Sequence, residues 1–382
     1  MKSFTRFAAT AAVALAVSAV FASSASAAAG PSASARHGGS QAAVFVQTDN
    51  TSGNAVVAYR RSASGTLTEA GSYSTHGLGG MLAGSVADHL ASQGSLTFDP
   101  QHGLLYAVNA GSNTVSVFAV DGDRLSLRQV IASGGTFPVS VAVRGDLVYV
   151  LNALGGGSVQ GFVVAGDRLI TVPSWNRALG LDPAATPQFV TTPGQVGFTG
   201  AGDQLVVTTK ANGSDIDVFN LSRYGAPSAE PVVNSEPGAV PFSFVDDGAN
   251  RLYLTEAGTN AVATFTVNRD GTVTQDAVSA TGQSATCWIV GTGDLLFADN
   301  AGSSTTSGYR IGSHGALTSL GNTSTDAGTV DASVSANGRY LYTQTGVNGI
   351  VDEFSIGAGG ALTELGSVTV PGAAGGEGIV AF

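Results

Sequence analysis

Apolar and polar residues alternate along this chain in a pattern that repeats seven times. Each repeat contains an apolar segment anchored by an aromatic residue or valine, with a polar residue three positions later. The anchor and polar pairs are Phe45 and Thr48, Tyr106 and Asn109, Tyr149 and Asn152, Val207 and Lys210, Tyr253 and Glu256, Phe297 and Asn300, and Tyr342 and Thr345. The last three intervals between anchors are 46, 44 and 45 residues, close to the length of four-stranded propeller blades.

A second segment follows each anchor after a short turn and alternates at period two, as half-buried β-strands do. These segments are residues 54–61, 113–120, 157–164, 214–221, 260–267, 304–311 and 348–356. Tight turns rich in Gly and Asp, such as Asp270-Gly271, lead to a third strand, and a short strand precedes every anchor strand except the first. Four strands in each of seven units predict an all-β, seven-bladed β-propeller of four-stranded blades.

Closure of the ring is predicted from the two ends of the pattern. The first unit lacks its innermost strand, and the chain finishes with an unassigned apolar segment at residues 378–382. We expect this segment to complete the first blade, because the pairing removes an open sheet edge. The predicted blades are residues 43–75 with 376–382, 94–133, 138–180, 187–236, 241–281, 285–325 and 329–370.

The N-terminal residues predict export. Lys2 and Arg6 precede an apolar stretch at residues 7–21, and small residues at 24–27 supply a cleavage site, so residues 1–27 have the pattern of a Sec-type signal peptide. A retained anchor is the alternative, although the apolar stretch is short for a membrane span. Residues 28–42, rich in Gly, Ser and Ala, are predicted to form a flexible leader of a secreted protein.

The charge of the chain disfavours two classes of partner. Removal of residues 1–27 removes two cations and takes the formal net charge from −11 to −13. Nucleic-acid binding needs a concentrated basic surface, and an anionic membrane repels an acidic protein. We therefore expect neither partner, and we expect a soluble monomer.

The single cysteine excludes an intramolecular disulfide. Cys287 lies in an apolar string, which favours a buried structural thiol over a nucleophile. The sequence has no Gly-x-Ser-x-Gly elbow, no His-Glu-x-x-His, no phosphate-binding loop and no Cys/His cluster. We therefore expect neither a metal nor a cofactor.

The polar residues after the seven anchors are the first candidates for a site. In a propeller they lie on the face where the channel opens, so Thr48, Asn109, Asn152, Lys210, Glu256, Asn300 and Thr345 are expected to form a polar ring there. The asparagines would orient a substrate, or they are ordinary turn residues that bond their own backbone. Lys210 and Glu256, on adjacent blades, would form an opposite-charge pair for acid–base chemistry, or a solvated ion pair.

Histidines supply a second candidate. His89 follows Asp88 in the long connection at residues 75–94 and could act as a general base at the channel mouth. A solvated loop histidine is the alternative. His102 and His314 are expected in hairpin turns at the periphery or on the opposite face.

Residues 241–265, with parallel runs at 96–118 and 195–219, resemble the seven-bladed lactonase family of 6-phosphogluconolactonase-like propellers and fungal carboxymuconate cyclases. Enzymes of that family open one innermost strand with Pro-Arg-His and close the next strand with Asn-Glu. Pro241 matches the proline and Glu256 the glutamate, whereas Phe242 and Ser243 replace the arginine and histidine. Another Pro-His element corresponds to Pro193-Gly194, again without the histidine.

The resemblance implies descent from lactonase propellers, with hydrolysis or isomerisation of a small lactone at the channel mouth as the expected chemistry. Glu256 would be the acid–base residue, Lys210 the electrophile and His89 a further base, with Asn109, Asn152 and Asn300 orienting the substrate. The second hypothesis is a non-catalytic propeller that binds a glycan, peptide or protein. A third is a scaffold of the cell envelope without a specific ligand.

Overall fold

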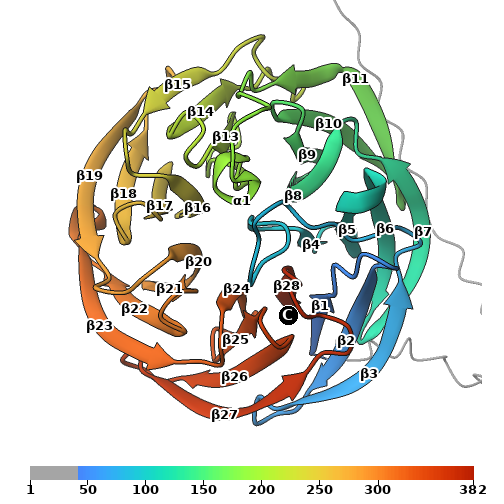
Figure 1. Ribbon diagram of the computed structural model, residues 1–382, viewed down its shortest axis with the longest axis vertical. Coiled ribbons are helices and arrows are strands. Elements are labelled where there is room, and N and C mark those ends of the chain that lie inside the picture. The colour runs from blue at the N-terminus through green and yellow to red at the C-terminus, as the bar shows by residue number, and fades with distance from the viewer. Residues whose placement is uncertain (1–41) are drawn as a thin grey trace, which may run out of the picture. The chain divides into compact units, whose positions relative to one another are not determined.

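The computed structural model describes residues 42–382, so the predicted signal peptide (1–27) and nearly all of the predicted leader (28–42) lie outside the described residues. The strands form seven sheets of four strands each around a central axis (Figure 1). The all-β, seven-bladed propeller predicted from the sequence is confirmed. Among residues 42–382, no helix has both the length and the apolar composition needed to cross a bilayer.

The first blade contains both ends of the propeller. Its strand order is β28 (Ile379–Ala381), β1 (Ala43–Gln47), β2 (Ala55–Arg61) and β3 (Leu67–Ser74). β28 is antiparallel to β1, with Val44 opposite Ala381. The ring of Phe382 extends this contact, since its centroid lies 4.8 Å from that of Phe98 and 5.6 Å from that of Phe45. The predicted closure by the C-terminal strand is therefore confirmed.

The other six blades follow in chain order. Blade 2 contains β4 (Leu96–Asp99), β5 (Leu104–Asn109), β6 (Thr114–Asp121) and β7 (Arg124–Ala132). Blade 3 contains β8 (Thr136–Arg144), β9 (Leu147–Leu154), β10 (Ser158–Ala165) and β11 (Arg168–Ala178). Blade 4 contains β12 (Val196–Phe198), β13 (Gln204–Thr208), β14 (Asp215–Asn220) and β15 (Val232–Ser235). Blade 5 contains β16 (Pro241–Asp246), β17 (Arg251–Glu256), β18 (Ala261–Val267) and β19 (Val273–Ala280). Blade 6 contains β20 (Thr286–Thr292), β21 (Leu295–Asn300), β22 (Thr305–Ile311) and β23 (Leu317–Ser324). Blade 7 contains β24 (Thr329–Val334), β25 (Tyr340–Thr345), β26 (Ile350–Ile356) and β27 (Leu362–Thr369). Short helices η1 (Ala110–Ser112), α1 (Gln188–Thr191) and η2 (Ser313–Gly315) lie in the connections.

The anchor residues of the sequence pattern form the core of the blades. All seven are at most 2% exposed: Phe45, Tyr106, Tyr149, Val207, Tyr253, Phe297 and Tyr342. Some of the tyrosine hydroxyls also join neighbouring blades, as when Tyr342 Oη donates to Gly65 O at 2.6 Å. Gly65 is required there, because its φ is +96° and a Cβ would lie 2.4 Å from the Tyr340 ring. An aromatic anchor and a glycine turn together explain how blade 7 packs on blade 1.

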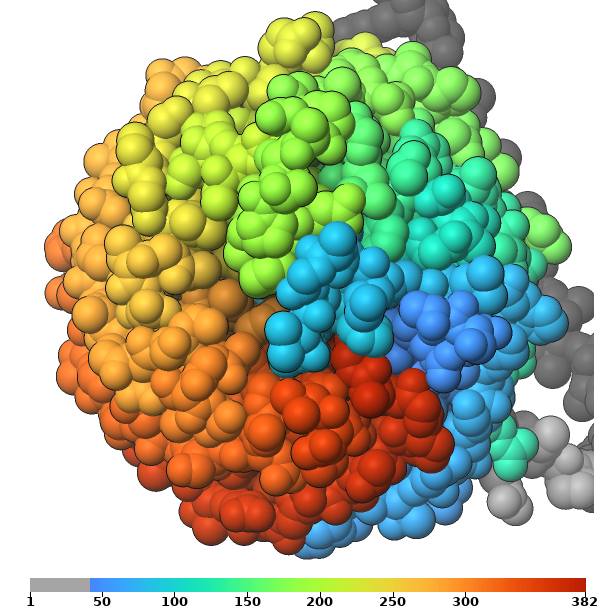
Figure 2. Space-filling view, viewed as in Figure 1, coloured from blue at the N-terminus to red at the C-terminus, as the bar shows by residue number. Residues whose placement is uncertain are grey.

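The connection between β3 and β4 reaches the axis of the ring, where it is the light-blue loop at the centre of Figures 1 and 2. We call residues 88–95 the axial segment. Two hydrogen bonds join Gln93 to Ile289 of blade 6. Gln93 Nε2 donates to Ile289 O at 2.8 Å, and Ile289 N donates to Gln93 Oε1 at 3.0 Å. Trp288 Nε1 donates to Ser92 O at 2.6 Å, and Gln93 N donates to Gly194 O at 3.1 Å. The segment is therefore held by blades on the far side of the ring.

Candidate functional site

A pocket of about 770 Å³ opens beside the axial segment at the mouth of the channel. Its walls come from the β3–β4 connection, from the α1 region and from blades 4 to 7. In Figure 2 the surface is hollowed between the light-blue connection, the green α1 region and the orange strands. Most lining side chains are apolar, including Phe189, Phe242, Trp288 and Val347. This volume and this character are typical of small-molecule sites.

Lys210 reaches the pocket, but its charged end is occupied by the protein itself. The residue follows β13 with a φ of +54° and is completely buried. Its Nζ donates to Ala91 O at 2.6 Å, Phe189 O at 2.8 Å and Thr192 Oγ1 at 3.2 Å, and lies 5.2 Å from the centroid of the Phe242 ring. Three acceptors use all three ammonium protons. Burial lowers the pKa of Lys210 to about 7, and the nearby Asp88 carboxylate partly opposes this shift.

Asp88 is the second charged group in the pocket lining. Its Oδ1 accepts from Leu90 N at 2.7 Å and its Oδ2 from Ser92 N at 3.1 Å, so the carboxylate fixes the turn that begins the axial segment. Burial raises the pKa of Asp88 to about 6, while the main-chain donors and Lys210 oppose the rise. In the sequence, Asp88 stands out only as a neighbour of His89. Its position in a connection without periodicity gave no signal that it would face Lys210.

Glu256 does not join Lys210, which corrects the expected opposite-charge pair. The glutamate is buried at the end of β17, and Ala257 and Gly258 line the pocket in its place. Its Oε2 accepts from Thr259 Oγ1 at 2.8 Å, and burial raises its pKa. No ion pair joins Glu256 to Lys210 in the described part of the chain.

His89 lies in the axial segment but does not line the pocket. Its main-chain N donates to Gly375 O at 2.8 Å, and its ring packs so closely on Gly375 that a Cβ there would lie 2.1 Å from Nε2. Burial lowers the pKa of the imidazole, and Nδ1 has no partner among residues 42–382. His89 therefore packs against Gly375 and is not positioned as a base in the pocket.

The expected polar ring at the channel mouth is not formed by the asparagines. Asn109, Asn152 and Asn300 are completely buried, and none lines the pocket. Each donates from Nδ2 to the next strand of its own hairpin: Asn109 to Ser116 Oγ at 2.9 Å, Asn152 to Ser158 Oγ at 3.5 Å and Asn300 to Ser307 Oγ at 2.9 Å. Thr48 and Thr345 are buried as well. The three asparagines therefore have a structural role, as the alternative expected, but they bond hydroxyls of the next strand and not only the main chain of their own turn.

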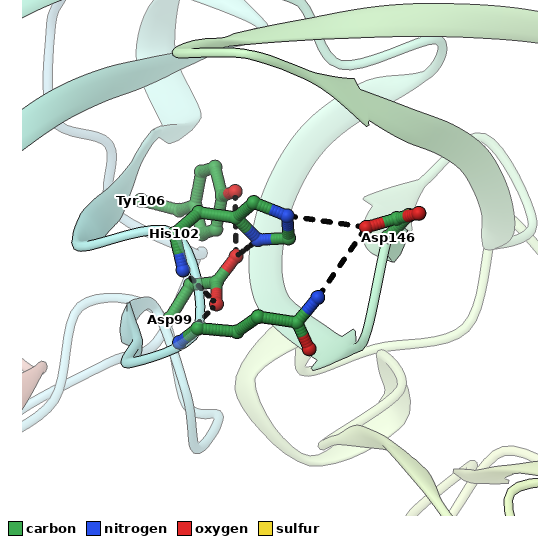
Figure 3. Close-up of polar contacts among 5 residues, drawn as sticks. Asp99, His102, Tyr106 and Asp146 are labelled. Carbon is green, nitrogen blue, oxygen red and sulfur yellow. Dashed lines mark hydrogen bonds and ion pairs between the residues drawn. The ribbon is translucent and has the colours of Figure 1, made fainter. Parts of the chain in front are cut away.

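His102 belongs to a separate polar cluster between the β4–β5 and β8–β9 turns (Figure 3). Its Nδ1 lies 2.7 Å from Asp99 Oδ2 and its Nε2 lies 3.1 Å from Asp146 Oδ1. Tyr106 Oη donates to Asp99 Oδ2 at 3.3 Å. The Asp99 carboxylate raises the pKa of His102. The cluster links blades 2 and 3, and none of its residues lines the pocket.

Ser304 is the pocket-lining residue with an available hydroxyl. It precedes β22, and its Oγ accepts from Gly328 N at 3.3 Å. Its O–H has no acceptor in the described chain, so it can donate to a bound molecule. Within residues 42–382, no group of three Asp, Glu, His or Cys side chains is arranged to hold a metal ion.

Cys287 should react slowly with thiol reagents in the folded protein. The residue is 8% exposed in the pocket wall, and burial raises its pKa to about 12. Because the thiolate is the reactive species, the raised pKa and the burial of the thiol both slow labelling. Labelling with Ellman's reagent at pH 8 should therefore be slow in buffer and rapid in 6 M guanidinium. A Cys287→Ser, Ser64→Cys variant gives the control rate of an exposed thiol, and native labelling at that rate would disprove burial.

The fold has many solved relatives, although neither the protein-family models nor the curated proteins match this sequence. A candidate 6-phosphogluconolactonase from Bacteroides fragilis is 20% identical, with a TM-score of 0.70 over 90% of this chain and 98% of that chain. The periplasmic gluconolactonase of Pseudomonas aeruginosa is 17% identical, with a TM-score of 0.71 over 89% and 98%. Virginiamycin B lyase from Staphylococcus aureus is 14% identical, with a TM-score of 0.54 over 77% and 89%. The chain thus has a lactonase-like propeller fold.

Proposed function

We propose that this chain is an exported propeller that binds an uncharged, largely apolar small molecule in the pocket at the channel mouth. The apolar lining is the observation that carries the proposal. A charged ligand would lose its hydration on entering such a pocket and would need a charged partner to compensate. The ammonium of Lys210 and the carboxylate of Asp88 already have their hydrogen bonds within the protein.

The polar requirement of the pocket is one hydrogen-bond acceptor on the ligand. Ser304 offers a single O–H donor beside the apolar walls. A ring or chain of apolar atoms with one carbonyl oxygen meets this requirement, and a neutral lactone is such a molecule. A sugar phosphate is disfavoured, since a phosphate is best held by arginine forks and no arginine lines the pocket in the described residues.

Hydrolysis of the lactone is the second candidate function. It is favoured by two titratable groups in the pocket wall, Asp88 with a pKa of about 6 and Lys210 with a pKa of about 7. A carboxylate in that range can serve as a general base for water. The base would then be Asp88 in place of Glu256, whose carboxylate is held by Thr259 outside the pocket lining.

Export is part of the proposal and is supported by the pattern of residues 1–27. Mass spectrometry of the protein recovered from the culture medium should give a chain that begins at residue 28. A chain retained in the cells at full length would contradict export, without bearing on the pocket.

Binding can be tested by calorimetry with a panel of neutral lactones and with 6-phosphogluconolactone. We expect the wild type to bind neutral lactones and not the phosphorylated sugar. Ala301→Trp should abolish binding by filling the pocket, and Ser304→Ala should weaken it about fivefold, the effect of losing about 1 kcal/mol of hydrogen bonding. Ala361→Trp, at an exposed turn residue, is the matched control.

The same panel separates binding from hydrolysis when ring opening is followed by pH-stat, with the spontaneous rate subtracted. Turnover that is lost in Asp88→Asn and kept in Glu256→Gln would establish the second candidate. Binding without turnover would leave the first candidate function, which is binding of a neutral molecule without catalysis. Equal affinity of the wild type and Ala301→Trp would show that the ligand lies elsewhere, and the proposal would fail.

A further inference from the structure

Four buried carboxyl groups lie in or near the axial segment, close enough to interact with one another. They are Asp49 after β1, Asp88 at the start of the axial segment, Asp331 in β24 and Glu377 before β28, and none is more than 6% exposed. Buried carboxyl groups of this kind are normally paired with cations. Here no ion pair includes any of the four within residues 42–382.

Neutral donors join Glu377 directly to the axial segment, and they join Asp49 and Asp331 to the main chain of residues 377–379 beside it. Glu377 is central: its Oε2 accepts from Ser92 Oγ at 2.9 Å, its Oε1 from Ser95 N at 3.4 Å, and its own N donates to Asp49 Oδ2 at 2.8 Å. Asp331 Oδ2 accepts from Ile379 N at 3.2 Å, which ties blade 7 to the same region. The position of the axial segment therefore depends on the charge of groups that it touches.

The surrounding titratable groups cannot neutralise four negative charges. They are Lys210 after β13, His89 on the axial segment, Cys287 of β20, Asp299 of β21 and Asp352 of β26. Lys210 is the single lysine or arginine among them, and it interacts with Asp88 and Glu377. Asp299 and Asp352 add further negative potential behind Asp331.

We propose that the four carboxyls form a proton-controlled latch. When they are protonated, the axial segment keeps the position described above, which we call the seated state. When they are ionised, they repel one another and the segment is released. The inference rests on the proposed function and adds regulation to it, because Asp88 and Ala91 of the axial segment form part of the pocket wall. Release would remove this wall, so ligand affinity should fall as the latch opens.

The direction of the pH effect follows from burial. Burial raises the pKa of Asp49 to about 8, of Asp331 to about 7 and of Asp88 to about 6, and it raises that of Glu377 well above its usual range. A raised pKa means that the seated state holds protons more tightly than an opened, hydrated state does. The seated state is therefore fully favoured below the usual carboxyl pKa of about 4 and loses this advantage as the pH rises through about 6 to 8.

Hydrogen exchange without ligand tests the latch directly. Exchange of peptides that cover residues 88–95 is measured by mass spectrometry from pH 5 to pH 9 and corrected for the intrinsic rate. Trp288 fluorescence in a Trp175→Phe background is the second readout, since Trp288 donates to Ser92 O. We expect protection to fall at least tenfold across this range, together with a shift in emission.

Asp49→Asn and Glu377→Gln remove charge and keep side-chain size, so together they should weaken the pH dependence of protection and leave only the part that arises from Asp88 and Asp331. Asp217→Asn is the matched control, because burial also raises the pKa of Asp217, to about 7, and Asp215 is the charged group beside it. The control should behave as the wild type does. If the charge-removing variants fail to fold, the wild-type profile still decides: protection that is constant from pH 5 to pH 9 would overturn the latch.

The same measurements distinguish control by protons from control by a cation, and the latch from the proposed function. Protection that is already lost at pH 5, where the carboxyls are protonated, and is restored there by 5 mM calcium would show that a cation, and not protons, controls the segment, and the proposal would fail. Because exchange is measured without ligand, a pH-dependent segment in a protein that binds no lactone would support the latch and refute the proposed function. Lactone affinity that stays constant while protection falls would disprove the coupling between them.

Discussion

Truncation after Val370 is expected to lower the melting temperature by about 10 °C. The deletion removes β28, which leaves the inner edge of β1 unpaired and exposes apolar surface that Ile379 and Phe382 cover. Loss of two large side chains and of the strand pairing corresponds to about 5 kcal/mol, a large part of the stability of a folded domain. Thermal unfolding followed by circular dichroism measures the change.

A synthetic peptide with the sequence of residues 371–382 supplies the control for this truncation. Added in excess, it should raise the melting temperature of the truncated chain and leave that of the full chain unchanged, because the site is free only in the former. A truncated protein that melts with the full-length chain would show that β28 does not close the ring.

Substitution of Lys210 by methionine is expected to destabilise the protein by about 3 kcal/mol. The ammonium is fully buried and satisfies Ala91 O and Phe189 O, so methionine leaves two buried carbonyls without this donor and Asp88 without its neighbouring cation. Urea denaturation at pH 6, where Lys210 is protonated, measures the loss as a lower midpoint with an unchanged slope.

Two variants show whether the loss arises from the buried contacts. Arg168→Met removes an exposed cation and should change stability by less than about 0.5 kcal/mol. In a cycle with Asp88→Asn, the cost of Lys210→Met should be smaller, since the carboxylate that it neutralises is already gone. A stable Lys210→Met protein that no longer binds ligand would instead place the ammonium against the ligand.

The blades could be predicted because their signal is local. Alternation at period two, an aromatic anchor and a glycine turn recur in every unit, and each feature acts between strands that are close in the sequence. Closure could be predicted as well, because an apolar strand at residues 378–382 had no partner left and blade 1 lacked an inner strand. Both features follow from the requirement that strand edges be paired.

The site could be predicted only in part, because strand position does not determine what a side chain meets. Asn109 and Lys210 hold the same place after their anchors, yet Asn109 bonds Ser116 of its own hairpin whereas Lys210 bonds carbonyls of α1 and the axial segment. The path of the axial segment is set by contacts such as that of Gln93 with Ile289, 196 residues away. No pattern within a single repeat contains that information.

The pairing of β28 with β1 also determines when the ring can close during synthesis. Among the strands of residues 42–382, β1 is synthesised first and its inner partner β28 is synthesised last. Until then, blade 1 has three of its four strands, and the axial segment lacks the Glu377 carboxyl that bonds Ser92. Contacts of such long sequence separation form slowly. The ring therefore cannot close until residues 379–381 have been synthesised and have left the ribosome.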